Sequence, residues 1–264
     1  MQKRHADLHQ YFEEQGRTTE KYVIPYIQEV APISRTIRVA EIGCGEAGNL
    51  MPFMNMGCTC VGVDIDAFKV EKGRELYKSH PNHHRLRLII KDIYATTPQE
   101  LGGPFDLIIL RDVIEHIPHQ SKFLGHLKQF LNPGGHVFFG FPPWRMPFGG
   151  HQQATNHHWL SKIPFTHLLP EALYLSLWRW CGESEGTLVA LQEIRSTGIS
   201  INRFRRIIRE NSYRLDRETL FLINPNYEIK FGLKPRVLPF FLNIPWLRDF
   251  FTTAVYAVTS VKSA

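Results

Sequence analysis

Short apolar segments recur along the first half of the chain, separated by glycine, proline and polar residues. A helical pattern at 7–31 comes first, and we expect a further helix after each of the first four strands, including 49–56, 66–78 and 121–131. Strands that alternate with helices predict a parallel sheet with helices on both faces. The segments with the length and composition of buried strands are 39–42, 60–64, 86–90, 105–110 and 136–141.

The second half of the chain interrupts this rhythm with two long segments. Residues 142–197 follow the fifth strand and hold prolines, glycines and several histidines. After a sixth strand at 219–223, residues 225–250 are rich in proline and aromatic side chains, and a seventh strand follows at 252–261. Segments of this length inside a compact domain are commonly functional. We therefore expect one domain, 1–264, with an α/β fold: a Rossmann-like, seven-stranded, mostly parallel sheet that carries two insertions.

Composition places the chain among ordinary globular proteins, because 43% of its 264 residues are hydrophobic and 21% are charged. The formal net charge of +6 is a small basic excess for a nucleic-acid-binding protein. One cluster of arginines lies on a helical pattern at 200–211 whose other face is apolar. We interpret this cluster as the solvated face of that helix, with a phosphate-bearing or anionic-membrane partner as the alternative. Its members are Arg203, Arg205, Arg206 and Arg209.

Targeting signals and cysteine usage indicate a compartment. The N-terminus has no apolar run after a basic start, so we expect no secretory signal. No stretch approaches the ~20 apolar residues of a membrane span. The cysteines form no C-x-x-C pair, which is typical of buried free thiols in a reducing compartment. These features predict a cytoplasmic protein.

The segment 38–50, R-V-A-E-I-G-C-G-E-A-G-N-L, carries the most specific chemical signal. A short strand runs into Gly43, Gly45 and Gly48, and a helix follows. Glycine permits tight turns and close approach of the backbone to a ligand, and a helix N-terminus offers free N–H groups. The G-x-G-x-x-G spacing alone is shared with nicotinamide and flavin sites. Glu41 narrows the class of ligand that this loop could bind, because a carboxylate suits a cationic amino-acid moiety and would repel a phosphate.

Later positions extend this signal, each after a predicted strand. Asp64 ends the second strand about 20 residues past the glycines, where a ribose diol is expected. Asp92 and Ile93 follow the third strand, and the fourth strand leads into 111–116, R-D-V-I-E-H. A proline-glycine-glycine turn at 133–135 precedes the fifth strand.

Together these landmarks resemble the class I S-adenosylmethionine-dependent methyltransferases. The closest resemblance is to the small-molecule branch that carries E-x-G-x-G-x-x-G and D-V-x-E-H motifs, and it covers residues 37–141. A dinucleotide-binding dehydrogenase would explain the glycines but not Glu41, Asp92 or the proline-glycine-glycine turn. The resemblance implies S-adenosylmethionine as cofactor and S-adenosylhomocysteine as its product. It also implies that 142–197 and 225–250 build a lid over the acceptor.

The resemblance assigns roles in cofactor binding to individual residues. Glu41 and the backbone carbonyl of Arg111 would face the methionine amine, while Asp64 would bind the ribose. Asp92 would accept the adenine amino group. The full set of implied cofactor residues is Glu41, Gly43, Cys44, Gly45, Gly48, Asp64, Ile65, Asp92, Ile93 and Arg111.

The reaction itself needs further groups. Methyl transfer from a sulfonium requires alignment and desolvation, and an oxygen nucleophile usually also needs a base or a metal. Asp112, Glu115 and His116 stand at i, i+3 and i+4, so a helix would place them on one face. We expect His116 and His151 to be catalytic, with at least one assisting proton removal, and no metal. The alternative is a magnesium or manganese site formed by Asp112, Glu115, His116 and His151, similar to relatives with E-x-x-E-H.

The sequence therefore predicts a methyltransferase that acts on a small-molecule acceptor, at oxygen, with no nucleic-acid partner. The alternatives are a nucleic-acid or protein methyltransferase and a catalytically inactive cofactor-binding or scaffold protein. The pattern indicates no oligomeric state. Peripheral membrane contact stays open, because the second insertion places Lys234, Arg236 and Arg248 beside aromatic residues that could face lipid. These aromatic residues are Phe240, Phe241, Trp246, Phe250 and Phe251.

Overall fold

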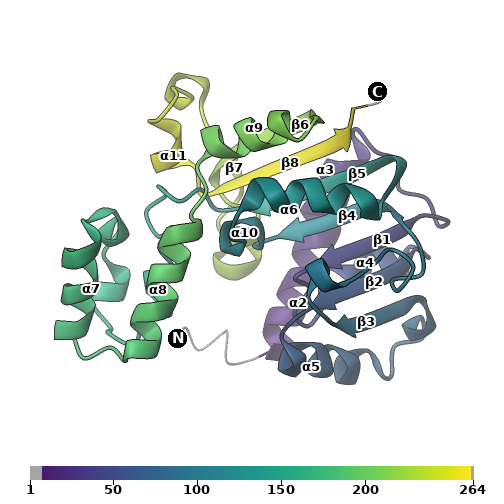
Figure 1. The fold of residues 1–264 in the computed structure, drawn as a ribbon, viewed down its shortest axis with the longest axis horizontal. Coiled ribbons are helices and arrows are strands. Elements are labelled where there is room, and N and C mark those ends of the chain that lie inside the picture. The colour runs from purple at the N-terminus through teal and green to yellow at the C-terminus, as the bar shows by residue number, and fades with distance from the viewer. Residues whose placement is uncertain (1–7, 263–264) are drawn as a thin grey trace.

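A mostly parallel, eight-stranded sheet forms the centre of the protein in the computed structural model, which describes residues 8–262 (Figure 1). Its strand order is β3-β2-β1-β4-β5-β8-β6-β7. The first five strands pair in parallel, whereas β8 runs antiparallel between β5 and β6. The strands are β1 (Arg38–Ile42), β2 (Thr59–Asp64), β3 (Leu86–Ile90), β4 (Phe105–Arg111), β5 (Leu131–Phe141), β6 (Tyr213–Ile223), β7 (Arg236–Val237) and β8 (Ala254–Val261).

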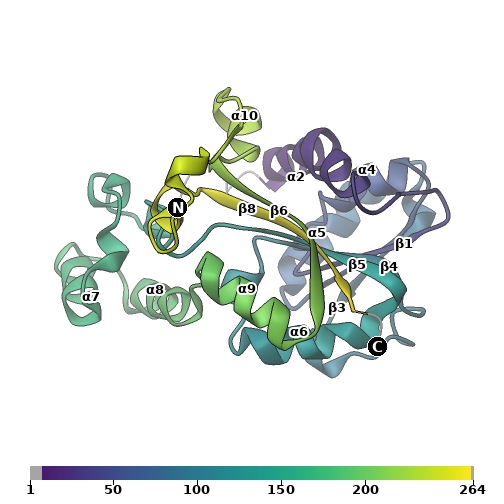
Figure 2. The ribbon, with the colours of Figure 1, turned by 90° about the horizontal axis from the view of Figure 1, so that it is seen from above.

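Helices cover both faces of this sheet, as predicted (Figure 2). The side chains of β4 alternate between two cores: Ile108 and Leu110 belong to the cluster with α6 and α9, whereas Leu107 and Ile109 belong to the cluster with α4 and α5. The helices are α2 (Leu8–Thr18), α3 (Ile24–Gln28), α4 (Leu50–Asn55), α5 (Ala67–Tyr77), α6 (Gln120–Leu127), α7 (Glu171–Trp180), α8 (Glu185–Thr197), α9 (Ile201–Glu210), α10 (Asn226–Phe231) and α11 (Arg248–Phe251).

Three details differ from the sequence prediction. The eighth strand, β7, is a two-residue pairing at the edge of β6, too short for alternation to reveal. The helical pattern at 7–31, of which residue 7 lies outside the described residues, is divided into α2, a π-helical turn at Thr19–Val23, and α3. No α-helix follows β3, where a 3-10 turn at Ile93–Ala95 leads into a segment broken by two prolines and two glycines before β4.

The two insertions form structure of their own at one end of the sheet. The first ends in α7 and α8, which stand away from the sheet (Figure 1). They share a small core of Tyr174, Trp178, Leu188 and Leu191, and α8 was not predicted. The second insertion contains α10 and β7 and leads into α11. The insertions touch each other: the rings of Phe165 and Phe250 lie 6.2 Å apart between centroids, and the Arg145 guanidinium lies 5.3 Å from the centre of the Trp246 ring.

Candidate active site

The predicted site residues gather at one edge of the sheet. Because β1 to β5 are parallel neighbours, their carboxyl ends open on the same side, where α/β sheets bind their ligands. Glu41 lies in β1 just before the glycine loop, and Asp64 ends β2. Asp92 follows β3, and Arg111 ends β4.

The glycine loop needs its glycines for conformation and for space. Gly43 and Gly45 have φ values of +71° and +53°, in the region that favours glycine. A Cβ on Gly48 would lie 2.4 Å from the backbone oxygen of Phe12 in α2. The third glycine therefore allows α2 to pack directly on the loop, which closes one side of the site.

Asp64 is held by the loop that it faces. Its Oδ2 accepts a hydrogen bond from the Gly45 N–H at 2.7 Å, and its Oδ1 accepts one from the Asp66 N–H at 2.8 Å. Asp64 is half-buried, so its carboxylate can still accept hydrogen bonds from a ligand. On the neighbouring strand end, Asp92 is exposed and accepts from the Tyr94 N–H at 2.9 Å. Ile65, between them in sequence, presents an exposed apolar side chain.

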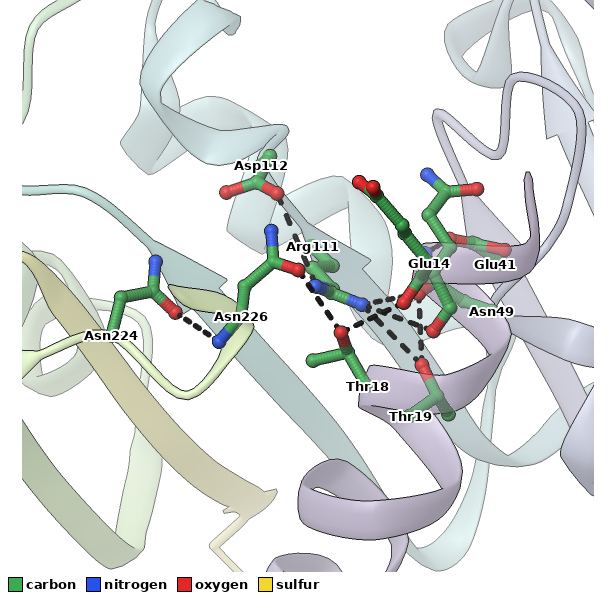
Figure 3. Close-up of polar contacts among 10 residues, drawn as sticks. Glu14, Thr18, Thr19, Glu41, Asn49, Arg111, Asp112, Asn224 and Asn226 are labelled. Carbon is green, nitrogen blue, oxygen red and sulfur yellow. Dashed lines mark hydrogen bonds and ion pairs between the residues drawn. The ribbon is translucent and has the colours of Figure 1, made fainter. Parts of the chain in front are cut away.

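Glu41 is a buried carboxylate that lacks a full set of partners (Figure 3). The Asn49 amide donates to its Oε1 at 2.5 Å, whereas its Oε2 has no hydrogen-bond partner among the described residues. Burial raises the pKa of Glu41 to about 8, although the Asn49 hydrogen bond and the charge of Arg111 act in the opposite direction. A cation placed beside Oε2 would therefore be strongly favoured.

The Arg111 side chain connects this carboxylate to the N-terminal helical segment (Figure 3). Its guanidinium is buried and donates to Asn49 Oδ1 at 2.6 Å and to the Gln15 carbonyl at 3.4 Å. The Thr19 hydroxyl donates to the same Asn49 oxygen at 2.8 Å. Asn49 and Thr19 were not predicted, because their role depends on how α2 and the π-helical turn pack across the glycine loop.

Residues 112–116 form no α-helix, so the i, i+3 and i+4 spacing of Asp112, Glu115 and His116 does not have the helical geometry that we considered. Asp112 has a φ of +55°, and a single 3-10 turn covers Ile114–His116. The Asp112 carboxylate is exposed and lies 4.0 Å from Arg111 Nε. Asp112, Glu115 and His116 therefore do not share the face of a helix.

Glu115, His116 and His151 nevertheless come together. One ligand atom from each lies within 4.8 Å of the others, and the two imidazole rings are 4.9 Å apart between centroids. Glu115 is buried, and neither of its carboxylate oxygens accepts a hydrogen bond from a described residue. Burial, and then the charge of Asp112, raises the pKa of Glu115 well above its usual range. Desolvation by the surrounding groups lowers the pKa of His116, although part of its side chain is exposed, and the imidazole is therefore neutral at pH 7.

No helix within residues 8–262 is long and apolar enough to cross a membrane. All four cysteines are free, three of them buried.

Comparison with known proteins agrees with this geometry. The ubiquinone biosynthesis O-methyltransferase of Agrobacterium fabrum is 30% identical over 102 residues, which span 39% of this chain and 39% of that relative. Magnesium protoporphyrin IX methyltransferase from Synechocystis PCC 6803, with bound S-adenosylmethionine, aligns with a TM-score of 0.53 at 13% identity, covering 94% of this chain and 80% of that one. PKMT2 from Rickettsia typhi, in complex with S-adenosylhomocysteine, aligns with a TM-score of 0.55 at 15% identity, covering 93% of this chain and 54% of that one.

The structural matches show the shared fold and confirm the predicted fold class. A family model for the methyltransferase domain matches residues 12–183, which is more than half of the chain. The chain therefore belongs to the methyltransferase domain family.

Proposed function

We propose that this protein transfers the methyl group of S-adenosylmethionine to an oxygen atom of a small-molecule acceptor. The observation that carries the proposal is Glu41, a buried carboxylate with one unpartnered oxygen at the start of the glycine loop. Such a group is suited to the ammonium of the methionine moiety. The ubiquinone biosynthesis O-methyltransferase among the relatives supports an oxygen acceptor, although the matched stretch covers only 39% of its length.

The cofactor would lie along the carboxyl ends of β3, β2, β1 and β4. Asp64 would accept hydrogen bonds from the ribose hydroxyls, and Asp92 would accept one from the adenine amino group. Backbone groups of the glycine loop and the Arg111 carbonyl would line the methionine end. The proposed contacts are Glu41, Gly43, Cys44, Gly45, Gly48, Asp64, Ile65, Asp92, Ile93 and Arg111.

We assign the acceptor side to His116 and His151. A neutral imidazole can take the proton of an acceptor hydroxyl as the oxygen attacks the methyl carbon, and the lowered pKa of His116 keeps it in that form. The insertions 142–197 and 225–250 would close over the acceptor as parts of a single domain. Their mutual contacts, Phe165 with Phe250 and Arg145 with Trp246, support this arrangement.

A divalent cation is the second candidate for activating the acceptor. Glu115, His116 and His151 place a carboxylate and two imidazoles within 4.8 Å of one another, and the Glu115 oxygens lack partners. Magnesium or manganese held there would lower the pKa of an acceptor hydroxyl. Asp112 is exposed at the edge of this group and would be a further ligand only after rearrangement.

Thermal denaturation with S-adenosylhomocysteine tests cofactor binding. Ligand at ~100 times its dissociation constant should stabilise the fold by roughly 2.7 kcal/mol. For a domain of this size, each kcal/mol raises the melting temperature by about 2–4 °C. A shift with NAD and none with S-adenosylhomocysteine would contradict the assignment.

Turnover in a chelator distinguishes the two modes of acceptor activation. An enzyme that uses only histidine keeps its activity after treatment with a chelator. A metal-dependent enzyme loses activity and regains it with magnesium or manganese.

Labelled S-adenosylmethionine, incubated with the protein and cell extract, tests the class of acceptor. We expect the label in the small-molecule fraction. Label in protein or nucleic acid would favour the alternative class of methyltransferase, and no transfer despite cofactor binding would favour an inactive binding protein.

The four free thiols support a reducing compartment, and we propose that the protein is cytoplasmic.

A further inference from the structure

We propose that residues 237–251, flanked by Lys234 and Arg236, form a docking surface for an anionic lipid bilayer. We call this the 237–251 surface. It contains the 3-10 turn at Phe240–Leu242 and α11, and it lies at the end of the molecule that also carries α7 and α8 (Figures 1 and 2). The proposal concerns a binding surface, and it does not depend on the proposed methyl transfer.

The first observation is a dense set of exposed apolar side chains. Phe240 is 90% exposed, Trp246 is 65% exposed and Phe241 is 61% exposed. Scattered exposed apolar residues are normal on protein surfaces, whereas a contiguous set of large ones marks a contact with another molecule or a membrane. The other exposed large hydrophobic side chains of the 237–251 surface are Val237, Ile244, Leu247 and Phe251.

The second observation is that polar side chains hold this segment from the inside. Arg248 is buried and donates to the amide oxygens of Asn243 and, from α9, Asn202. Asp249 is also buried and accepts from the Ile201 N–H at 3.2 Å. Leu238 lies in the main core. The backbone is thus fixed to α9 and the sheet, while Phe240, Phe241 and Trp246 keep most of their surface exposed. Trp246 does so although Arg145 lies over its ring, so the exposure of these side chains belongs to the fold.

The third observation is the charge around these rings. Between residues 229 and 251 the sole acidic residue is Asp249, and it is buried. Lys234 and Arg236 are exposed on the same segment. Aromatic side chains inserted at headgroup depth, beside cations that meet anionic lipid, form the usual composition of a peripheral membrane contact.

The same charges disfavour a second copy of the chain as the occupant. A two-fold interface pairs a patch with itself, so Lys234 and Arg236 would approach their own counterparts without an exposed acid on the segment to neutralise them. An anionic bilayer meets both properties of the surface, because it offers negative headgroups above an apolar layer.

Vesicle co-sedimentation of the full chain, without cofactor or acceptor, tests the proposal. We expect binding to vesicles of equal parts phosphatidylcholine and phosphatidylglycerol to exceed binding to pure phosphatidylcholine by at least about tenfold, and to fall with added salt. The double variant Phe240→Ser/Trp246→Ser should lose about tenfold or more in partitioning, because both rings leave the lipid.

The matched control is Phe68→Ser/Trp180→Ser, which removes the same two residue types at positions that are 65% and 85% exposed but lie on α5 and α7. It should bind vesicles like the unchanged protein. Equal loss in both double variants, or no binding to the anionic vesicles, would overturn the proposal. Sedimentation velocity provides a separate outcome: a dimer that dissociates with Phe240→Ser/Trp246→Ser would assign the surface to a second copy.

Discussion

The cofactor edge and the second insertion display opposite mismatches between a side chain and its surroundings. At the edge of the sheet where the carboxyl ends of β1 to β4 meet, which we call the cofactor edge, Glu41 is a carboxyl group placed in the interior with one oxygen unpartnered. In the 237–251 surface, Phe240 and Trp246 are apolar groups placed in water. Each arrangement costs free energy in the isolated protein, and each is relieved by a contact of matching chemistry. The comparison teaches that a fold can indicate its ligands by side chains whose polarity does not match their surroundings.

The largest expected effect separates chemistry from binding at the cofactor edge. His116→Ala or His151→Ala should lower turnover by about 10²–10⁴-fold, because general-base assistance contributes that much. Cofactor affinity should stay within about twofold of the unchanged protein, since neither ring lies in the proposed cofactor contacts. Calorimetry and initial rates measure the two effects.

His84→Ala, an exposed histidine after α5, is the control and should leave both quantities unchanged. The rate should also rise as pH increases through the lowered pKa of His116 and then level off, because only the neutral ring accepts a proton. Normal turnover in both alanine variants would show that neither histidine acts as a base and that catalysis depends on positioning alone.

The next effect concerns the ribose contact. Asp64→Ala should weaken S-adenosylhomocysteine binding roughly ten- to hundredfold, because charge-assisted hydrogen bonds are worth about 1.5–3 kcal/mol. The variant should still fold, although it also removes the acceptors for the Gly45 and Asp66 N–H groups and so loosens the loop. Asp66→Ala, which leaves the Asp64 carboxylate in place, controls for the change in loop charge. Unchanged affinity in folded Asp64→Ala would show that the ribose lies elsewhere.

The sequence predicted where the candidate site residues gather better than it predicted the structure of the insertions, for a physical reason. Asp64 ends one strand of regular apolar pattern and Asp92 follows the next, and parallel strands place their carboxyl ends together whatever the loops do. The Asn49–Arg111 contact has no such signal, because it is created only when α2 packs on the glycine loop. The left-handed backbone of Asp112 likewise has no signal in the sequence, and it breaks the helical spacing that 112–116 would otherwise allow.

The helices and strand of the insertions were poorly predicted, because prolines and irregular apolar spacing give no clear helical or strand pattern. The helix α8 packs on α7 rather than on the sheet, so its apolar residues match a small local core. The strand β7 has two residues and shows no alternation. The aromatic content of 225–250 was evident from the sequence, but only the structure separates Leu238, which is buried, from Phe240, which is exposed.

The Glu41→Gln variant tests the buried carboxyl group of the cofactor edge, because it removes the titratable group and keeps the shape of the side chain. The folded pKa of Glu41, about 8, lies above the value near 4.5 of the unfolded chain, so the folded state binds this proton more tightly. Unfolding free energy therefore falls as pH rises between these values, and Glu41→Gln should abolish that contribution. Urea denaturation of the cofactor-free protein at both ends of this range should show the variant with the smaller decrease.

The same variant should bind S-adenosylhomocysteine about tenfold more weakly, because the ammonium loses its charged partner. Asn49→Asp, which instead adds an acid beside Glu41, should raise the dependence of stability on pH. A Glu41→Gln variant with unchanged stability at every pH and unchanged affinity would show that this carboxylate is an ordinary structural group.

The smallest expected effect tests whether the two regions are coupled at all. The Thr18 hydroxyl in α2 shares its proton between the Glu14 carbonyl at 2.8 Å and Asn226 Oδ1 in α10 at 3.0 Å, and the second contact joins the N-terminal helix to the second insertion (Figure 3). Thr18→Val and Asn226→Ala should each lower the unfolding free energy by about 0.5–1.5 kcal/mol, the usual net value of one hydrogen bond. Because both changes remove the same bond, the double variant should cost less than the sum of the two, with an interaction energy of at least about 0.5 kcal/mol. Denaturant titration of the four proteins measures this cycle. Additive losses would show that α10 is held by its other contacts, such as the ion pair between Lys21 and Glu228 at 3.0 Å, and not by this hydrogen bond. If the coupling also grows when S-adenosylhomocysteine is present, the cofactor edge and the insertion close together, because ligand binding then strengthens the contact that links them.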